Sequence, residues 1–396
     1  MSLAAWVALG LAVLSALTLA GVVRGRWHMR QAWQPGPRQK PREQVPRVVL
    51  LRPCAGAEPM LEHCLLSAGA CQRAGLEVHV VMLTASETDT AMPVAQNAAA
   101  TLRAGGLTAS CRVVPPRGPN RKASLLAGAL EAYPEADVVL VADSNVDLRG
   151  LDLLQMVQPL LDEPTLGAVW VPPVQRRWAD GPLSSGARAS EAVLNGSLHA
   201  FPLLSALDAR GMVGKLFGFE PRAVAAAGGL DAVVDVLGED MELARRLREA
   251  GFTTRSAPFV APSYVHMREL GAAVDRYARW MAVIRGQRPH LLPTYPLFFA
   301  PLPLVLVLSA VGAAALPQTA TLAVGVALSG RTLVALTARW LAGDGLALRH
   351  ALGDILLAEI VLSSAFVRVL RSRELAWRGT ALRVDRGGKL RVVRDA

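Results

Sequence analysis

The residues best suited to chemistry begin with a carboxylate that directly follows an apolar run. The stretch VVLVADSNVDLRG covers residues 138–150, and its first half predicts a buried strand that ends at Asp143. α/β proteins commonly bind ligands at the carboxyl ends of such strands, and carboxylate oxygens suit Mg²⁺ or Mn²⁺. Asn145 stands where a second carboxylate would strengthen a metal site. A turn or helix N-cap is the structural alternative for Asp143.

Two more acidic positions and one basic segment follow the same pattern. TASETDTAM carries Asp89 in a loop after an apolar run, and VLGEDMELARRLREAGF places Glu239 and Asp240 at the head of an amphipathic helix. RYARW, residues 276–280, precedes a long apolar stretch. Each has a structural alternative: a solvated loop acid, acids that complement a helix dipole, and arginines that bind lipid headgroups. The order of these positions along the chain favours a shared site.

Alternating strand-like and helix-like segments would position these residues. Strands are predicted at 47–51, 77–83 and 137–143, and helices at 58–75 and 187–201. This alternation predicts an α/β fold with a mostly parallel sheet, covered by helices on both faces. Ligands of such sheets lie beyond the carboxyl ends of the strands. The sequence contains no GxxxxGK[ST] motif, and no GxGxxG motif in a strand–helix context.

Composition indicates a membrane protein with a basic surface. Of 396 residues 52% are hydrophobic and only 19% are charged, which is too apolar for an ordinary soluble enzyme. The net charge of +10 fits an anionic membrane or a phosphorylated substrate. Nucleic acid is not favoured as a partner, because no basic run alternates with aromatic residues. The four cysteines form no CxxC pair and are typical of packing residues in a reducing compartment.

Uncharged runs near both ends predict membrane segments. Residues 3–23 carry no charge and can cross a bilayer; a cleaved signal peptide is the alternative, but no basic residue precedes the run. The basic flank at 24–42, with Trp27 and Trp33, is expected on the cytoplasmic side. Three apolar runs follow the central region, at 291–315, 319–338 and 351–367. The last contains Asp354 and Glu359, which predicts either a helix that faces a bundle or one at the interface. The basic tail should be cytoplasmic. If all three C-terminal runs crossed the membrane, the tail would lie on the opposite side, so either one run does not cross or the charge rule fails here.

The order of Asp89, Asp143, Asp240 and RYARW resembles the family 2-like inverting glycosyltransferases of the GT-A fold. Within that group the chain is most similar to the ceramide glucosyltransferases of family 21 and their bacterial relatives, including those proposed for hopanoid lipids. The supporting stretches are VLLRPCAGAEPMLEHCL, SETDTAM, GPNRKASLLAGAL, EAVLNGSLHAF and GGLDAVVDVLGEDMELARRLREAGF. Two residues depart from the family pattern: Asn145 replaces the second acid of DxD, and Arg52 replaces a lysine of the first strand.

The resemblance implies a site for a UDP-sugar. Asp89 would contact the uracil or ribose. Asp143, with Asn145, would coordinate Mg²⁺ or Mn²⁺ that bridges the diphosphate. Other basic and aromatic residues would complete the donor site, namely Lys122, Arg276, Arg279 and Trp280.

The resemblance also implies the catalytic group and its neighbours. Asp240 would accept the proton of the acceptor hydroxyl, with attack from the opposite face of the sugar and inversion at the anomeric carbon. Glu239 and His199 would have accessory or acceptor roles. Trp280 would stack on the acceptor or line the mouth of the site.

These inferences predict a membrane enzyme with five regions. They are an N-terminal transmembrane helix (1–25), a basic linker (26–45), a cytoplasmic GT-A domain (46–290), C-terminal transmembrane or interfacial helices (291–371) and a cytoplasmic tail (372–396). The expected activity is sugar transfer, most simply of glucose, from a UDP-sugar to ceramide at the inner membrane. Alternatives are a hopanoid or diacylglycerol acceptor, or an inactive nucleotide-binding scaffold. A processive polysaccharide synthase is less favoured, because so few helices would line a pore poorly.

Overall fold

The chain forms two compact units in the computed structural model, which describes residues 2–32, 45–74, 76–178, 183–208, 211–267, 269–346, 348–377 and 380–393. One, called here the sheet unit, comprises residues 31–178, 209–266 and 389–396. The other, called here the helical unit, comprises residues 1–30, 179–208 and 267–388. The division differs from the expected domain at 46–290, because 179–208 and 267–290 group with the apolar helices. Most of the expected linker, residues 33–44, lies outside the described residues.

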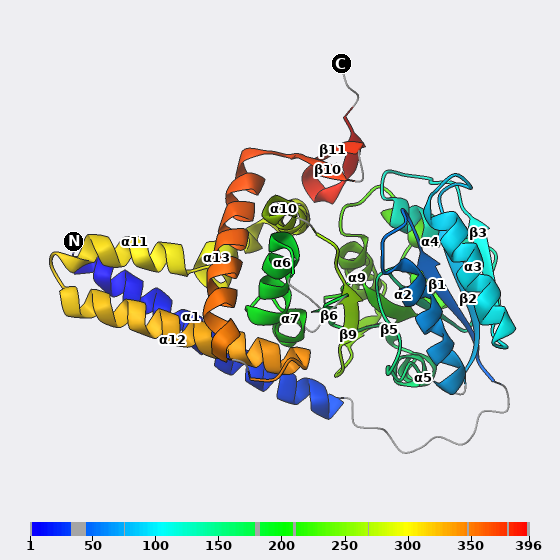
Figure 1. The fold of residues 1–396 in the computed structure, drawn as a ribbon, viewed down its shortest axis with the longest axis horizontal. Coiled ribbons are helices and arrows are strands. Elements are labelled where there is room, and N and C mark those ends of the chain that lie inside the picture. The colour runs from blue at the N-terminus through cyan, green and yellow to red at the C-terminus, as the bar shows by residue number, and fades with distance from the viewer. Residues whose placement is uncertain are drawn as a thin grey trace. The chain divides into compact units, whose positions relative to one another are not determined.

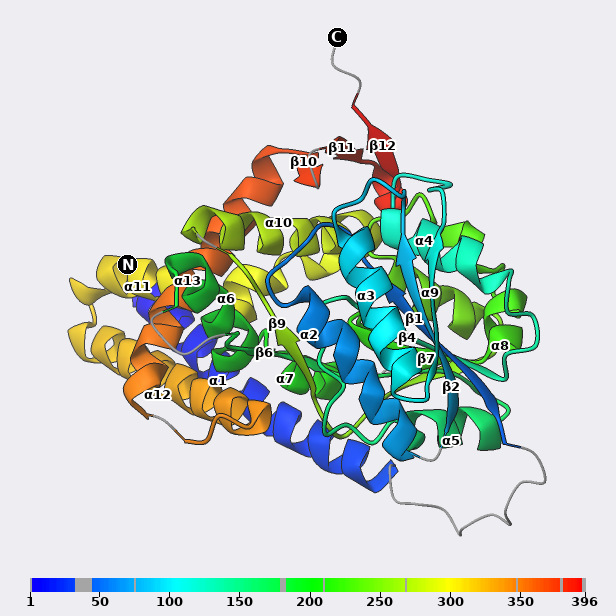
Figure 2. The ribbon, with the colours of Figure 1, turned by 45° about the vertical axis from the view of Figure 1, so that its right-hand side comes forward.

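The sheet unit is built around a seven-stranded sheet, most strands of which are labelled in Figures 1 and 2. The strand order is β3-β2-β1-β4-β7-β5-β8. Only β7 runs antiparallel to its neighbours, and the other pairings are parallel. The strands are β1 (Arg47–Pro53), β2 (Glu77–Thr84), β3 (Thr108–Val113), β4 (Val138–Ala142), β5 (Leu166–Trp170), β7 (Leu216–Phe219) and β8 (Thr253–Ser256). The expected α/β class with a mostly parallel sheet is confirmed.

The central strands are apolar on both faces because helices cover both faces. In β1, Val48 and Leu50 belong to one core, and Val49 and Leu51 belong to the other, as the two-residue period of a strand requires. The first core includes α3 (Ala91–Ala104), and the second includes α4 (Arg121–Leu130) and α9 (Glu239–Glu249). The unit also contains α2 (Leu61–Leu66), η1 (Ser67–Ala74), α5 (Leu154–Asp162), α8 (Pro221–Ala226), η2 (Leu230–Val233), β6 (Pro173–Arg176), β9 (Ala261–Tyr264) and β12 (Leu390–Val392).

The helical unit contains the apolar helices that the sequence predicts. Its elements are α1 (Ser2–Ala32), α6 (Ser185–Gly196), α7 (Phe201–Leu207), α10 (Leu270–Gln287), η3 (Pro289–Leu291), η4 (Tyr295–Phe299), α11 (Leu302–Ala313), α12 (Pro317–Ala342), α13 (Leu348–Arg371), β10 (Glu374–Trp377), β11 (Thr380–Val384) and η5 (Arg386–Gly388). Helices α1, α11 and α12 lie side by side (Figure 1). Small residues allow this close approach: a side chain on Gly312 would meet Ala5, and one on Gly330 would meet Ala16.

Two of these helices, Leu3–Trp27 and Pro317–Ala342, are long and apolar enough to cross a membrane. The expected run at 291–315 is broken: Pro289–Phe299 and Leu302–Ala313 meet at an angle of 63° and count as a third span only if taken together. The break falls at Pro301, whose ring cannot continue a helix from the preceding turn. Length and composition therefore support two spans, or three with the bent pair.

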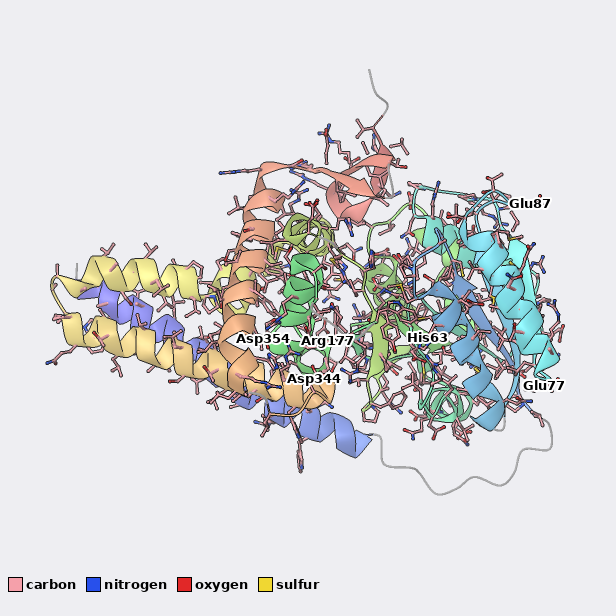
Figure 3. The ribbon with its side chains drawn as sticks, in the orientation of Figure 1. His63, Glu77, Glu87, Arg177, Asp344 and Asp354 are labelled. Carbon is pink, nitrogen blue, oxygen red and sulfur yellow. The ribbon has the colours of Figure 1, made fainter. Side chains whose placement is uncertain are left out.

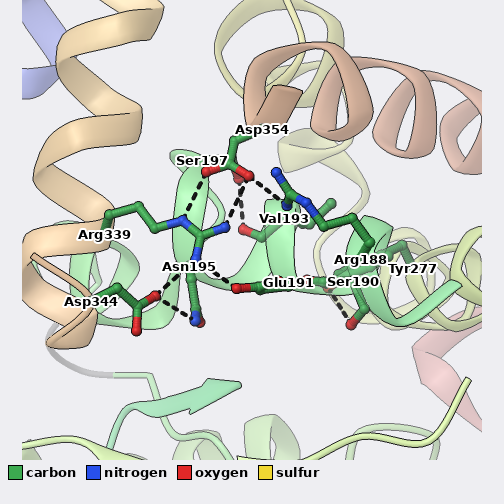
Figure 4. Close-up of polar contacts among 10 residues, drawn as sticks. All are labelled: Arg188, Ser190, Glu191, Val193, Asn195, Ser197, Tyr277, Arg339, Asp344 and Asp354. Carbon is green, nitrogen blue, oxygen red and sulfur yellow. Dashed lines mark hydrogen bonds and ion pairs between the residues drawn. The ribbon is translucent and has the colours of Figure 1, made fainter. Parts of the chain in front are cut away.

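Helix α13 is not among the membrane-spanning candidates of the described chain, and its two carboxylates point into the helical unit. Asp354 is fully buried and pairs with Arg188 at 2.6 Å and with Arg339 at 2.8 Å (Figure 4). Arg339 of α12 also contacts Glu191 of α6 at 2.7 Å. Glu359 pairs with an arginine of α12 in the same way. Of the two expectations for this segment, the contacts match the helix that faces a bundle.

Candidate active site

The antiparallel pairing of β4 with β7 sets Lys215 opposite Asp143. Ala142 pairs with Leu216 at the end of β4, and the next backbone N–H, that of Asp143, donates to the Lys215 carbonyl at 2.9 Å. The Lys215 ammonium lies 2.9 Å from Asp143 Oδ2. Residues directly opposite each other in an antiparallel pair have neighbouring side chains, so the register of the sheet itself creates this ion pair.

Lys122 supplies a second ammonium from the first turn of α4. Its Nζ lies 2.8 Å from Asp143 Oδ1 and 3.4 Å from Glu239 Oε1, and it donates to the carbonyl oxygen of Gly214. A lysine ammonium has three N–H donors, and these three acceptors match that number. Lys122 therefore holds two carboxylates from different parts of the chain in fixed positions.

Asn120 joins the start of α4 to the start of α9. It is fully buried, and its Oδ1 caps α4 by accepting from the Ala123 N–H at 3.1 Å. Its Nδ2 donates to the Val236 carbonyl at 2.8 Å and to Glu239 Oε2 at 3.0 Å. Through this one side chain the two helix N-termini that carry Lys122 and Glu239 share a fixed geometry.

The ion pairs keep Asp143 and Lys122 charged. Burial by itself raises the pKa of Asp143, but the ammonium groups of Lys122 and Lys215 outweigh burial and hold the pKa well below its usual range. Burial by itself lowers the pKa of Lys122, but Asp143 and Glu239 outweigh it and raise the pKa above its usual value. Both side chains remain about one-fifth exposed, at 21% and 18%. Both groups are therefore charged at neutral pH and partly accessible to solvent.

Asp240 has a pKa that is shifted in the opposite direction to that of Asp143. Its Oδ2 accepts from the Gly214 N–H at 2.7 Å, and its Oδ1 accepts from the Met241 N–H at 2.8 Å. Burial and the neighbouring charge of Glu239 raise the pKa of Asp240 to about 6. Gly214 packs closely against this pair, because a Cβ there would lie 2.9 Å from Lys122 Nζ and 3.2 Å from Asp240 Oδ2, and the lysine side chain would have to shift. An acid with this pKa can accept a proton near neutral pH.

The loop that carries Asn145 is fixed from two sides. Asn145 Nδ2 donates to the Tyr264 carbonyl at 2.7 Å, and Asn145 Oδ1 accepts from Lys215 Nζ at 2.9 Å. Arg52, the replacement for the family lysine, is fully buried and donates to the carbonyl oxygens of Asp143 at 3.2 Å and Val146 at 2.9 Å. Arg52 therefore positions the backbone of this loop.

The residues around Asp143 do not form a ready cation site. Both carboxylate oxygens of Asp143 and the Oδ1 of Asn145 bind lysine ammonium groups. Within the described ranges no three His, Cys, Asp or Glu residues are grouped so that they could hold a metal ion. Mg²⁺ and Mn²⁺ prefer several oxygen ligands, and the chain offers one carboxylate and one amide that are already engaged. Metal ligation by Asp143 and Asn145 remains a prediction that competes with Lys215.

Asp89 lies in the same sheet unit, in the loop after β2. Its Oδ1 accepts from the Gly56 N–H at 2.8 Å and from the Ala91 N–H at 3.0 Å, so it ties the loop after β1 to the start of α3. Gly56 has a φ of +73°, which disfavours other residues in this turn. Glu87 on the same loop is exposed (Figure 3). The half-buried Asp89 carboxylate thus holds two loops at the carboxyl edge of the sheet.

The RYARW motif lies on α10 in the helical unit, beside His199. The Arg276 guanidinium lies 4.8 Å from the centre of the Trp280 ring and donates to Ser190 Oγ at 3.2 Å. Trp280 stacks on His199, with ring centres 5.8 Å apart and an angle of 11° between the planes. Arg279 is half-buried in the same motif. Two expected site residues from distant parts of the sequence, His199 and Trp280, therefore meet.

His199 is held in its neutral form by an aromatic cluster. Burial and the nearby charge of Arg276 lower the pKa of His199 to about 4. His199 Nε2 lies 3.3 Å from Tyr295 Oη, and Tyr277 packs edge-on at 5.7 Å between ring centres. The ring is therefore a neutral hydrogen-bonding group at physiological pH and has no role as a cation.

Sequence reasoning did not find Lys215, Asn120 or Gly214. Asn120 could have been found as an N-cap, because it directly precedes a helix-like run in GPNRKASLLAGAL. Lys215 precedes the short apolar run LFGF, but nothing local shows that this run enters the sheet antiparallel to β4. Gly214 lies against two side chains, Lys122 and Asp240, that are distant from it in sequence, so no local pattern marks it.

Comparison with known proteins identifies a family match over nearly the whole chain. The family model described as Glycosyl transferase family 21 matches residues 13–390. A search of curated proteins finds no match. The family match agrees with the order of acidic positions and the RYARW motif.

Several solved structures have a similar fold, and three of them hold a nucleotide or a nucleotide sugar. One is the mannosyltransferase PcManGT from Pyrobaculum calidifontis in complex with GDP-Man and Mn²⁺, with 18% identity, 92% of this chain and 99% of that chain covered, and a TM-score of 0.47. Another is S. aureus TarS 1-349 in complex with UDP-GlcNAc, with 10% identity, 88% and 99% covered, and a TM-score of 0.37. A third is glucosyl-3-phosphoglycerate synthase from Mycobacterium tuberculosis in complex with Mg²⁺ and UDP, with 16% identity, 60% and 79% covered, and a TM-score of 0.33.

Proposed function

Since the chain belongs to glycosyl transferase family 21 and has the GT-A fold, we propose that it transfers glucose from UDP-glucose to the primary hydroxyl of ceramide with inversion at the anomeric carbon. The observation that carries the proposal is Asp240, a half-buried acid with its pKa raised to about 6, held beside the ion-paired Asp143 and Lys122. Nucleotide-sugar transfer is the chemistry of the family, and the donor and acceptor named here are the more specific part of the proposal.

Asp240 acts as the general base. Its carboxylate accepts the proton of the acceptor hydroxyl while the hydroxyl oxygen forms a bond to C1 of the sugar. The bond between C1 and the diphosphate oxygen breaks, and UDP leaves with the electron pair. The Gly214 N–H, at 2.7 Å from Oδ2, keeps the carboxylate oriented during this step. Lys122 holds Glu239 nearby, and Glu239 keeps the base strong enough to accept the proton.

The remaining expected residues are assigned to substrate binding. Asp89 contacts the uracil or ribose, since its loop lies at the carboxyl edge of the sheet. Arg276 and Arg279 are assigned to the diphosphate charge because of their motif in this family. Trp280 is assigned to the acceptor, and His199 supports its ring by stacking on it.

A lipid acceptor fits the rest of the molecule. Two helices are long and apolar enough to cross a membrane, and the basic residues that follow the first one favour a cytoplasmic flank. The proposal therefore assigns the catalytic residues to the cytoplasmic side of the inner membrane, where UDP-sugars are present and the acceptor hydroxyl would lie at the bilayer surface.

The proposal is tested with purified protein in lipid nanodiscs that contain ceramide. UDP-glucose should yield UDP and a glucosylated lipid in equal amounts, and Asp240→Asn should reduce the rate about 10²- to 10⁴-fold because no base remains. UDP binding, measured by calorimetry, should persist in the variant. Nanodiscs with diacylglycerol or a hopanoid in place of ceramide identify the other acceptors.

Two outcomes would contradict the proposal. If no nanodisc composition supports UDP release while UDP still binds, the chain is a nucleotide-binding scaffold. If Asp240→Asn retains its rate, another group is the base. Lipid extracts from cells that express the chain or the Asp240→Asn variant provide the same comparison without purification, since only the first should contain the new glycolipid.

A further inference from the structure

Lys215 binds the two oxygen atoms that a divalent cation would need. Its ammonium lies 2.9 Å from Asp143 Oδ2 and 2.9 Å from Asn145 Oδ1. The other oxygen of Asp143 pairs with Lys122 at 2.8 Å. A metal ion at Asp143 would have to displace an ammonium group and would then lie beside a second positive charge, which it repels.

The position of Lys215 is fixed by the backbone. The strand register sets it opposite Asp143, and the Asp143 N–H donates to its carbonyl at 2.9 Å. Its side chain is 19% exposed, so the ammonium is largely enclosed but can be reached by a ligand. A group that is fixed in this way needs little reorganisation when an anion arrives.

The neutral side chain at position 145 fits this arrangement. Lys215, Asp143 and Asn145 together carry one positive and one negative charge. An aspartate at 145 would give the same cluster a net negative charge, which attracts a metal ion and repels a diphosphate. Asn145 keeps the hydrogen bond to Lys215 without that charge, and its Nδ2 is anchored at 2.7 Å to the Tyr264 carbonyl.

We propose that the Lys215 ammonium takes the place of the divalent cation and binds the diphosphate of the nucleoside diphosphate-sugar donor directly. The inference rests on the proposed function and assigns a residue that the sequence motifs did not include. Lys122, whose three donors are matched by protein acceptors, keeps Asp143 in position, and Lys215 supplies the charge that stabilises the leaving UDP.

The test measures UDP binding to the full chain in nanodiscs by calorimetry, once with a chelator and once with Mn²⁺. The wild type should bind UDP with affinities that agree within about twofold in the two conditions. Lys215→Met should weaken binding in chelator by about tenfold to hundredfold, as the loss of a charge-assisted hydrogen bond predicts. Lys215→Met with Asn145→Asp should recover binding in Mn²⁺ only. Bound Mn²⁺, counted by electron paramagnetic resonance, should appear in this double variant and be absent from the wild type.

Lys389→Met is the matched control, because Lys389 also pairs with an aspartate in the sheet unit but is 66% exposed. It should bind UDP like the wild type, and a matching circular dichroism melt verifies the fold of each variant. Binding of UDP to the wild type only in the presence of Mn²⁺ would overturn this inference and leave the proposed function intact. A wild type that binds UDP in neither condition would overturn the proposed function and the inference with it.

Discussion

Asp240 joins two features that determine how its activity depends on pH. It is half-buried at the first turn of α9, and a second acid, Glu239, precedes it in the chain. Both features favour the protonated form, so the pKa rises to about 6. A base must be ionised to accept a proton, and the rate should therefore fall as the pH drops through this value.

The pH profile of kcat/KM tests this account, since it reports groups of the free enzyme. We predict an acidic limb with a midpoint near pH 6, below which kcat/KM falls about tenfold per pH unit. Glu239→Gln removes the neighbouring negative charge, lowers the pKa of Asp240 and should move the limb to lower pH. Glu249→Gln, at the far end of the same helix, should leave the limb in place. An unchanged limb in Glu239→Gln would exclude the electrostatic coupling.

At the scale of elements, the starts of α4 and α9 depend on one buried side chain. Asn120 caps α4 and donates to the Val236 carbonyl and to Glu239. Lys122 follows it by two residues, so any shift of the helix start moves the ammonium that holds Asp143.

Asn120→Ala should therefore affect both stability and activity. The loss of a helix cap and of buried hydrogen bonds predicts a decrease of about 2–4 kcal/mol in the free energy of unfolding of the sheet unit. Asn97→Ala, an exposed asparagine on α3, should change it by less than about 0.5 kcal/mol. Denaturant melts followed by tryptophan fluorescence compare the two variants. Equal midpoints would show that Asn120 does not stabilise the contact between the starts of α4 and α9.

In the helical unit, the ion pairs around Asp354 connect α6, α12 and α13 (Figure 4). Asp354 is fully buried between Arg188 and Arg339. Removal of one partner leaves uncompensated buried charge, so Asp354→Asn should destabilise the unit by about 3–5 kcal/mol. Asp275→Asn breaks an exposed pair with Arg368 and should cost less than about 1 kcal/mol. Thermal melts in nanodiscs measure the stability of both variants. Similar losses of stability would contradict the prediction that the buried ion pair matters more than the exposed one.

At the scale of the whole molecule, local patterns predicted the elements well. The expected strands at 47–51, 77–83 and 137–143 correspond to β1, β2 and β4, because buried parallel strands are continuous apolar runs. The expected helix at 58–75 is shorter, since α2 ends at Leu66 and a 3-10 helix follows.

What the sequence could not predict depends on contacts between distant segments. Lys215 reaches Asp143 only because β7 enters the sheet antiparallel between β4 and β5. The placement of α6, α7 and α10 with the apolar helices likewise follows from packing, and the composition of these helices does not show it. Periodicity describes one segment at a time, so it identified Asp143 and missed its partner.

The insertion of β7 also constrains the order in which the strands of the sheet can pair during synthesis. The chain leaves the sheet unit after Trp178, contributes α6 and α7 to the helical unit, and returns to place β7 in the middle of the sheet. During synthesis β1 to β4 can pair as they emerge, but β5 lacks the strand that joins it to β4 until residues 216–219 have been made. The long segment between β4 and β7 must close before β7 can pair with β4. This pairing is therefore slow relative to the pairing of the earlier strands. The ion pair between Asp143 and Lys215 is thus completed late in translation, and a nascent chain that stops before Lys215 has Asp143 without this partner.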